Sequence, residues 1–367
     1  MFVNDEVGTL EEVGLFGPPG METYLTQFYP PEVSLCFGQF DVFGAQKEFN
    51  GLVGLLGQLG VVVLDMKDAF VQTLGPPSIS GAELVSSLVD KVKQSPHSTG
   101  EPDVGTLAHL LDLDAKMYGS EDKAIAMNAA LSLIPELPLG NIFFARDQAN
   151  VLFDTCFLSN MKYPIRQPEV AVIKAALEKM GYKKFVQITD GTFEGGDGMV
   201  MKGAAYIGSG MRTSPAAVAQ IAGCLQDQGK LTYMVTIPDQ GGWHENMEVM
   251  HLDTFGMPVS QSHYYGCIPV LQQCTTKNML SGEDETFMAH LMGKGFNICG
   301  IPVDEQKNYA ANMMGVKPGV VVAPSDYNPE TTASLINDGI TVHSAKLIHL
   351  TQAVGATHCM GLQTQKV

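Results

Sequence analysis

The chain has 367 residues, 45% of them hydrophobic, so it can bury a sizeable core in one large or two ordinary domains. Its formal charge of -17 argues against binding to nucleic acid or to an anionic membrane, because both need basic surfaces that neutralise phosphate. No run approaches the roughly 18 apolar residues that span a bilayer, and the opening MFVNDEVGTLEE does not resemble a signal peptide, so we expect a cytoplasmic protein.

The first third of the chain changes from a strand signal to helical signals. After a strand candidate at residues 61–64, strand signals vanish between about Ala69 and Pro135. The segments GAELVSSLVDKV, GTLAHLLDLDAKMY and EDKAIAMNAALSLI have the periodicity of consecutive helices. We interpret residues 69–135 as a helical insertion in a single α/β domain that spans residues 1–367.

Short strands and helices then alternate, which predicts a repeated α/β module. Three helices share boundary signals, with a proline at the start and a glycine at the end, and each is followed by a strand-like run, KFVQI, LTYMVTI or ITV. Short strands separated by helices favour several small sheets over one wide sheet. The helix boundaries are Pro168 and Gly181, Ser214 with Pro215 and Gly229, and Asn328 with Pro329 and Gly339; further strand candidates are residues 142–144, 151–153, 249–252, 296–298 and 320–322.

Seven cysteines form an odd count without a C-x-x-C pair, which predicts reduced thiols and no disulfide framework or zinc knuckle. Most are interpreted as small buried apolar side chains. Cys359 differs, because it lies in GATHCMGLQTQKV, a segment without a helix or strand pattern. We expect a turn there that presents the thiol to a ligand.

Two polar clusters adjoin strand-like runs. In GNIFFARDQAN, Arg146 and Asp147 follow an apolar run, and they are either site residues at a strand end or a solvated ion pair. In TFEGGDGMV, two glycines separate Glu194 from Asp197 and permit a tight bend at which the two acids converge. The alternative for this second cluster is an ordinary acidic turn.

A third cluster, His251-Leu252-Asp253, has the two-residue period of a strand. On a strand, His251 and Asp253 project from the same face, which suits a histidine that moves protons beside a carboxylate that holds a cation. The alternative is a core histidine with satisfied hydrogen bonds.

Metal and phosphate chemistry find little support. Several potential ligands lie within twenty residues, but there is no H-E-x-x-H spacing, no P-loop and no strand-flanked G-x-G-x-x-G. We therefore expect no metal and no cofactor. The potential ligands are His244, Glu245, His251, Asp253 and His263.

A cysteine, a histidine and several carboxylates without a metal favour nucleophilic catalysis at an electrophilic carbon. Acids around a thiolate repel an anionic substrate but bind a planar guanidinium through paired, charge-assisted hydrogen bonds. This residue set therefore indicates guanidine chemistry.

The motifs VNDEVGTLEEVGLFGPPGMETYL, NIFFARD, FEGGD, HLDT and HCM, in this order, resemble the arginine deiminases among the guanidine-modifying enzymes of the pentein superfamily. The similarity runs through nearly the whole chain and includes the helical insertion. It implies an α/β fold of five pseudo-repeated modules, a propeller with five-fold pseudo-symmetry, and a site at its central axis. It also implies a tendency to form homo-oligomers.

The resemblance assigns a role to each matching residue. Cys359 matches the nucleophile, His251 the general acid/base and Glu194 the residue that hydrogen-bonds the histidine. Asp147 and Asp253 match the carboxylates that clamp the guanidinium. Arg166 and Arg212 match the arginines that bind the substrate's α-carboxylate, which favours free L-arginine over agmatine; Asp197 matches a supporting acid, and Asn141 and Phe144 match further pocket residues.

The chain departs from the family pattern near the nucleophile. Val354 stands where many bacterial arginine deiminases have an arginine, the loop lacks their run of glycines, and the segment after Met360 is short. The expected reaction converts L-arginine to L-citrulline and ammonia through a covalent cysteine adduct. An amidinotransferase or arginine dihydrolase on the same fold, and an inactive arginine-binding pentein, remain alternatives.

Overall fold

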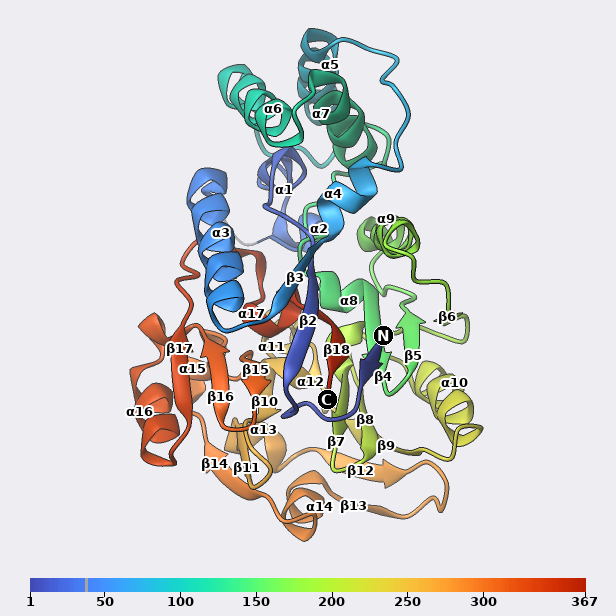
Figure 1. The fold of residues 1–367 in the computed structure, drawn as a ribbon, viewed down its shortest axis with the longest axis vertical. Helices are drawn as coiled ribbons and strands as arrows, with labels where there is room; N and C mark the ends of the chain where they lie inside the picture. The colour runs from blue at the N-terminus through green and yellow to red at the C-terminus, as the bar shows by residue number, and fades with distance from the viewer. Residues whose placement is uncertain (37–38) are drawn as a thin grey trace.

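The computed structural model describes residues 1–36 and 39–367. In this part of the chain the strands form five small sheets and no wide one, as the short strand signals predicted (Figure 1). The sheets consist of β1 (Phe2–Val3), β18 (Leu362–Lys366), β2 (Leu10–Leu15) and β3 (Val62–Asp65); β4 (Ala149–Leu152), β5 (Thr155–Leu158) and β6 (Phe185–Gln187); β7 (Gly198–Met201), β8 (Ala204–Ser209), β9 (Leu231–Thr236), β12 (Thr275–Asn278) and β13 (Asp284–Thr286); β10 (Gly256–Pro258), β11 (His263–Gly266) and β14 (Asn297–Gly300); and β15 (Met314–Lys317), β16 (Val320–Ala323) and β17 (Thr341–Ser344).

Each sheet contains the same three-strand unit, which confirms the predicted repeated module. Its first two strands are antiparallel, as in β4–β5, and its third strand is parallel to the second, as in β5–β6. The sets β7–β8–β9, β10–β11–β14, β15–β16–β17 and β18–β2–β3 have the same pattern. A helix precedes the third strand in every unit: α3 (Val42–Gln58), α9 (Gln167–Lys179), α10 (Pro215–Gln226), α14 (Phe287–Gly293) or α16 (Pro329–Asn337).

The predicted helix boundaries are confirmed with one difference. Pro215 and Pro329 are the first residues of their helices. Gly181, Gly229 and Gly339 follow the helices at φ 97°, 70° and 79°, in the left-handed region that glycine adopts without strain. Asn328 does not cap its own helix, because its side chain donates instead to the carbonyl of Pro324 at 2.6 Å.

Residues 66–133, all of them described, form helices and turns without a strand. Polar N-caps begin the longer helices: Ser80 and Glu83 form a reciprocal capping box, and the Asp103 carboxylate accepts from the Thr106 N–H. Helices α5, α6 and α7 lie together at one end of the molecule (Figure 1). This stretch contains α4 (Met66–Val71), α5 (Gly81–Gln94), α6 (Val104–Tyr118), α7 (Glu121–Asn128) and a π-helical turn η1 (Ala129–Leu133).

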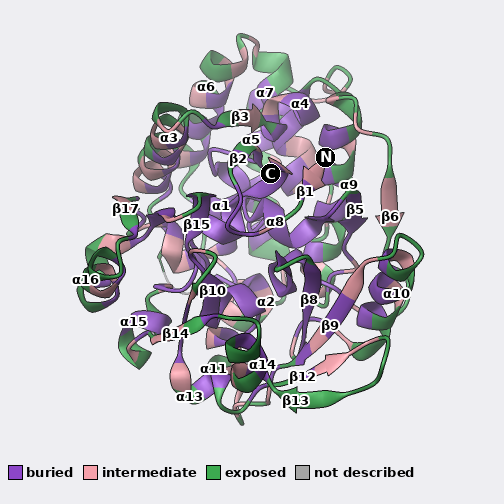
Figure 2. Cartoon of the chain, turned by 60° about the horizontal axis from the view of Figure 1, so that its bottom comes forward, coloured by how far each residue is buried: buried purple, intermediate pink, exposed green. Residues whose placement is uncertain are grey.

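Burial follows this arrangement. Strands β5 and β8 are buried along their whole length, whereas peripheral helices such as α10 and α16 carry exposed residues on their outer side (Figure 2). Among the described residues, no helix has the length and apolar character needed to cross a bilayer. Further short helices are α1 (Met21–Thr26), α2 (Pro31–Ser34), α11 (Trp243–Glu248), α13 (Ile268–Leu271), α15 (Val303–Lys307), η2 (Pro164–Arg166), η4 (Ser325–Tyr327) and η5 (Leu350–Ala353).

Candidate active site

Asp147, Asp197, Asp253 and Cys359 lie on single helical turns that lead into the first strands of different units, and Glu194 and His251 directly precede two of these turns. These turns are α8 (Ala145–Gln148) before β4, η3 (Gly195–Asp197) before β7, α12 (Leu252–Phe255) before β10 and α17 (Thr357–Met360) before β18. The turns contact one another, α8 with α17 and with η3, and α12 with η3. Equivalent positions of the repeated unit therefore bring distant segments together.

Two predicted strands at the site were wrong. Residues 142–144 form a turn before α8, and residues 249–252 lead into α12. His251 is the N-cap of α12, and Asp253 lies in its first turn, so the two side chains do not share a strand face. A run of three or four apolar residues suits a buried turn as well as a strand, and periodicity cannot separate the two.

The expected turn at residue 359 was also partly wrong, because Cys359 lies in the helical turn α17, directly before strand β18. Its sulfur is buried, lies 3.8 Å from Asp253 Oδ2, and accepts from Asn312 Nδ2 at 3.1 Å. Burial and the charges of Asp253 and Asp147 raise the pKa of the Cys359 thiol. The thiol therefore needs a cation or hydrogen-bond donors to ionise.

His251 lies between two carboxylates. Its Nε2 is 3.0 Å from Glu194 Oε2, the contact that the resemblance predicted, and its Nδ1 is 3.6 Å from Asp147 Oδ1. Burial opposes the charged ring, yet Asp147, Glu194 and Asp197 raise the pKa of His251 to about 9. The imidazole is therefore a cation at neutral pH and can donate a proton.

Glu194 faces two arginines, His251 and one backbone N–H group. Arg212 Nη1 donates to its Oε2 at 3.0 Å, Arg166 Nη1 lies 3.8 Å away, and the Lys162 N–H donates to Oε1 at 3.0 Å. Burial alone raises the pKa of Glu194, but the Arg212 guanidinium and the His251 ring hold it well below its usual range. Glu194 is thus a fixed anion behind the histidine.

The two arginines predicted to bind a substrate carboxylate are both at the site and buried. Arg166 donates to Asp147 Oδ2 at 2.7 Å and to Glu169 Oε2 at 2.9 Å. Arg212 lies over the ring of Tyr163, 4.5 Å from its centroid, and its Nη2 faces the sulfurs of Met247 at 3.2 Å and Met250 at 3.4 Å. A substrate carboxylate would have to compete with these partners, so this role stays a prediction.

Asp147 and Asp253, the predicted guanidinium ligands, share one property. Each has one oxygen hydrogen-bonded to a side chain, Asp147 Oδ2 to Arg166 and Asp253 Oδ2 to His358 Nδ1 at 2.6 Å. The other oxygen of each, Oδ1, is buried without a hydrogen bond among the described residues, and Asp147 Oδ1 has only the 3.6 Å ion-pair contact with His251 Nδ1. Buried acceptors of this kind are normally satisfied, which indicates a ligand with N–H donors.

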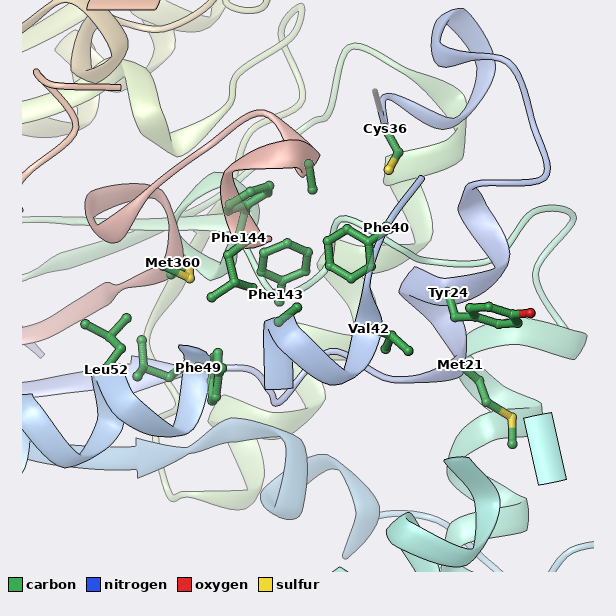
Figure 3. Packing of buried hydrophobic residues seen from close by; sticks show 14 of the residues in the cluster. Met21, Tyr24, Cys36, Phe40, Val42, Phe49, Leu52, Phe143, Phe144 and Met360 are labelled. Carbon is green, nitrogen blue, oxygen red and sulfur yellow. The ribbon is translucent and has the colours of Figure 1, made fainter. Parts of the chain in front are cut away.

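The remaining predicted residues, Asp197, Asn141 and Phe144, are also buried. Asp197 Oδ1 accepts from the Leu252 N–H at 3.0 Å, and burial raises the pKa of Asp197 to about 6. Asn141 donates to the carbonyl of Ser34 at 2.9 Å. Phe144 packs with Phe143, Phe40 and Met360 in one buried cluster, which also includes Cys359 (Figure 3).

The glycines of FEGGD are required by close packing. A Cβ on Gly196 would lie 2.6 Å from His251 Nδ1 and 3.1 Å from Asp147 Oδ1, and one on Gly195 would collide with the carbonyl of Arg146. Arg146 itself is buried, donates to the Gly198 carbonyl at 2.8 Å and lies 3.4 Å from Glu6. The alternatives of a solvated ion pair and an ordinary acidic turn therefore do not hold.

Three site residues were missed in the sequence. His358 joins Asp253 to Glu6, because its Nε2 lies 2.9 Å from Glu6 Oε1. Asn312 contacts both the sulfur and the backbone of Cys359. Glu6 and His358 lie inside motifs that carry the family resemblance, but the resemblance assigned no role to either residue. Asn312 is a single polar residue among apolar neighbours.

Asp147, Glu194 and His251 also offer a place for a metal ion, since one ligand atom of each lies within 4.8 Å of the others. Arg166 and Arg212, however, already neutralise the two carboxylates. A cation at this point would meet two buried guanidinium groups, so the charges suit a metal poorly.

Comparisons with known proteins agree with this geometry. The sequence profile of the arginine deiminase family matches residues 35–364. An arginine deiminase of Rhodococcus jostii (strain RHA1) is 26% identical, with 97% of this chain and 95% of the relative aligned. An uncharacterized Bacillus subtilis (strain 168) protein, YkgA, is 25% identical over 59% of this chain and 67% of its own length.

Solved structures share the fold at lower identity. DDAH from Pseudomonas aeruginosa in complex with citrulline is 17% identical, has a TM-score of 0.61, and the match covers 97% of this chain and 99% of the other. The N-terminal domain of ArgZ, an arginine dihydrolase of cyanobacteria, is 14% identical with a TM-score of 0.63 and coverages of 97% and 98%. These are mixed α/β pentein folds with several sheets. With the family profile spanning residues 35–364, the chain belongs to the arginine deiminase family.

Proposed function

We propose that this protein is an arginine deiminase that hydrolyses free L-arginine to L-citrulline and ammonia. The observation that supports this most is that Asp147 and Asp253 each keep one buried oxygen, Oδ1, without a hydrogen bond among the described residues, while the Asp253 carboxylate lies 3.8 Å from the sulfur of Cys359. A guanidinium is planar, cationic and carries N–H donors in a fixed fork, which suits two carboxylate acceptors. Its charge also offsets the carboxylates that oppose ionisation of the thiol.

The reaction begins when the Cys359 thiolate attacks the guanidinium carbon and forms a carbon–sulfur bond. The His251 imidazolium donates its proton to one terminal nitrogen, and the carbon–nitrogen bond breaks to release ammonia. A thiouronium adduct remains on Cys359. Glu194, a fixed anion, stabilises the imidazolium before this transfer.

Water completes the cycle. The neutral imidazole of His251 accepts a proton from the water that attacks the thiouronium carbon, and the carbon–sulfur bond breaks to restore the thiolate. The carbonyl of citrulline forms as the remaining hydroxyl proton passes to ammonia. Arginine and water thus become citrulline and ammonium.

The outer part of the substrate defines the specificity. We assign its α-carboxylate to Arg212 and Arg166, which requires the methionine sulfurs now facing Arg212 to move aside. Asn141 and Phe144 complete the pocket wall, and Asp197 supports α12 through its bond to the Leu252 N–H.

We further propose that the five units are blades of a propeller with five-fold pseudo-symmetry, because they share one strand order. Residues 69–135 are then an insertion within a single catalytic domain at 1–367. All seven cysteines are free, which suits the reducing cytoplasm, and the family resemblance suggests a homo-oligomer.

Product analysis tests the proposal. Purified protein is incubated with arginine, agmatine or methylated arginines; we expect citrulline with one ammonia from arginine, and an adduct on Cys359 by mass spectrometry. Cys359→Ser should lose both. Ornithine with two ammonias and CO₂ would identify a dihydrolase, a transferred amidino group an amidinotransferase, and calorimetric binding of arginine without turnover a binding protein.

A further inference from the structure

Asn312 occupies in the fifth unit the place that the site residues occupy in the other four. It lies two residues before β15, the first strand of its unit, just as Asp147 lies two residues before β4 and Cys359 three before β18. Its side chain is fully buried. The repeated fold therefore delivers Asn312 to the same centre as the residues already described.

The hydrogen bonds of Asn312 fix which end of its amide faces the sulfur. The backbone N–H groups of Ala356 and Cys359 both point at Oδ1, each at 3.1 Å, and an N–H can only donate. Nδ2 must then face the other way, toward Cys359 Sγ at 3.1 Å and the Asp253 carbonyl at 3.2 Å. Both of its hydrogens are used, and one of them points at the sulfur.

The main chain of Asn312 holds the same turn. Its carbonyl accepts from Thr357 Oγ1 at 2.8 Å and from the His358 N–H at 3.3 Å. One residue thus binds the backbone of Cys359 and of the residues just before it, as well as the sulfur itself.

We propose that Asn312 is a positioning residue that directs an N–H at the sulfur of Cys359 and so favours its thiolate form. This role deepens the proposed function, in which the thiolate is the attacking group. Donation to the charged form of an acid stabilises that form. The bond acts against burial and the nearby carboxylates, which raise the pKa of Cys359.

The test titrates the thiol without a substrate. Thiolate absorbance in the ultraviolet is followed against pH, and the signal of Cys359 is the difference from a Cys359→Ser variant in the same background. Asn312→Asp keeps an acceptor for the two backbone N–H groups but loses the donor, and Asn312→Ala loses both. We expect Asn312→Ala to move the midpoint up by about one to two pH units, the size of a lost hydrogen bond to a charged group. Asn312→Asp should move it at least as far, because its carboxylate also adds a negative charge beside the sulfur.

Thr357→Val is the matched control. It removes the hydroxyl bonds to the carbonyls of Asn312 and Val322, at 2.8 Å and 3.0 Å, without touching the sulfur. Its midpoint should equal that of the wild type. The proposal is overturned if both Asn312 variants fold, as judged by circular dichroism, and titrate like the wild type, or if Thr357→Val shifts the midpoint equally. Failure of arginine turnover would refute the proposed function but leave this titration unaffected.

Discussion

Replacing Glu194 by glutamine tests the charge balance on which the site depends. The substitution keeps the shape of the side chain but removes the anion that pairs with Arg212 at 3.0 Å and faces His251 at 3.0 Å. Both partners are buried, so each loses a compensating charge. Removing one partner of a buried pair costs about 3–5 kcal/mol, because the other charge stays buried and unpaired.

A surface pair supplies the control. Asp112 and Lys116 form an exposed ion pair one helical turn apart, 54% and 69% exposed. Such pairs contribute about 0.3–0.5 kcal/mol, so Asp112→Asn should barely change the free energy of unfolding. Both variants are unfolded with urea at neutral pH and compared with the wild type.

Glu194→Gln should also change how the free energy of unfolding depends on pH. The folded pKa of His251 is raised to about 9, above its ordinary value of about 6.5. Its stabilising contribution is therefore complete below about pH 6.5 and disappears as the pH rises through about 9. Without the Glu194 charge the folded pKa falls, so this loss should begin at lower pH. A Glu194→Gln protein within about 1 kcal/mol of the wild type at neutral pH, with an unchanged alkaline profile, would refute the assigned charges.

Two further substitutions probe packing and specificity. Gly196→Ala places a Cβ 2.6 Å from His251 Nδ1 and should lower kcat/KM at least about tenfold, whereas Gly54→Ala, with open space around it, should preserve activity. Arg212→Lys keeps the charge but loses the planar fork, and steady-state kinetics should show a fall of about 10–100-fold in kcat/KM for arginine and a smaller fall for agmatine. An equal fall for both substrates would show that Arg212 serves only Glu194.

Features that depend on local chemistry could be predicted from the sequence. Proline and glycine mark helix ends because their backbone preferences act within a few residues, and residues 185–187, 231–236 and 341–344 formed strands as expected. Strand β18 was missed for a physical reason. Its polar residues Gln363, Thr364 and Lys366 are buried, and each of their side chains forms a hydrogen bond. The segment therefore lacks the alternation of apolar and polar residues that predicts a strand.

Some site residues could likewise be predicted from the sequence and others could not. An acid beside glycines in an apolar run, such as Glu194, indicates a site because a buried charge needs a specific partner. Asn312 gives no such signal, since its partners at 356 and 359 lie more than forty residues away and a lone amide fits many loops. The fold decides which backbone groups hydrogen-bond to a buried amide, so a sequence pattern cannot predict them.

The contact between Glu6 and His358 joins positions 352 apart in the sequence. Closing so long a loop is entropically costly, and folds dominated by distant contacts form slowly. During most of the folding reaction, the Cys359 thiol therefore lacks its contacts with the Asp253 carboxylate and the Asn312 amide. Reactivity toward guanidines should emerge only when the native topology is complete, which protects a partly folded chain from its own nucleophile.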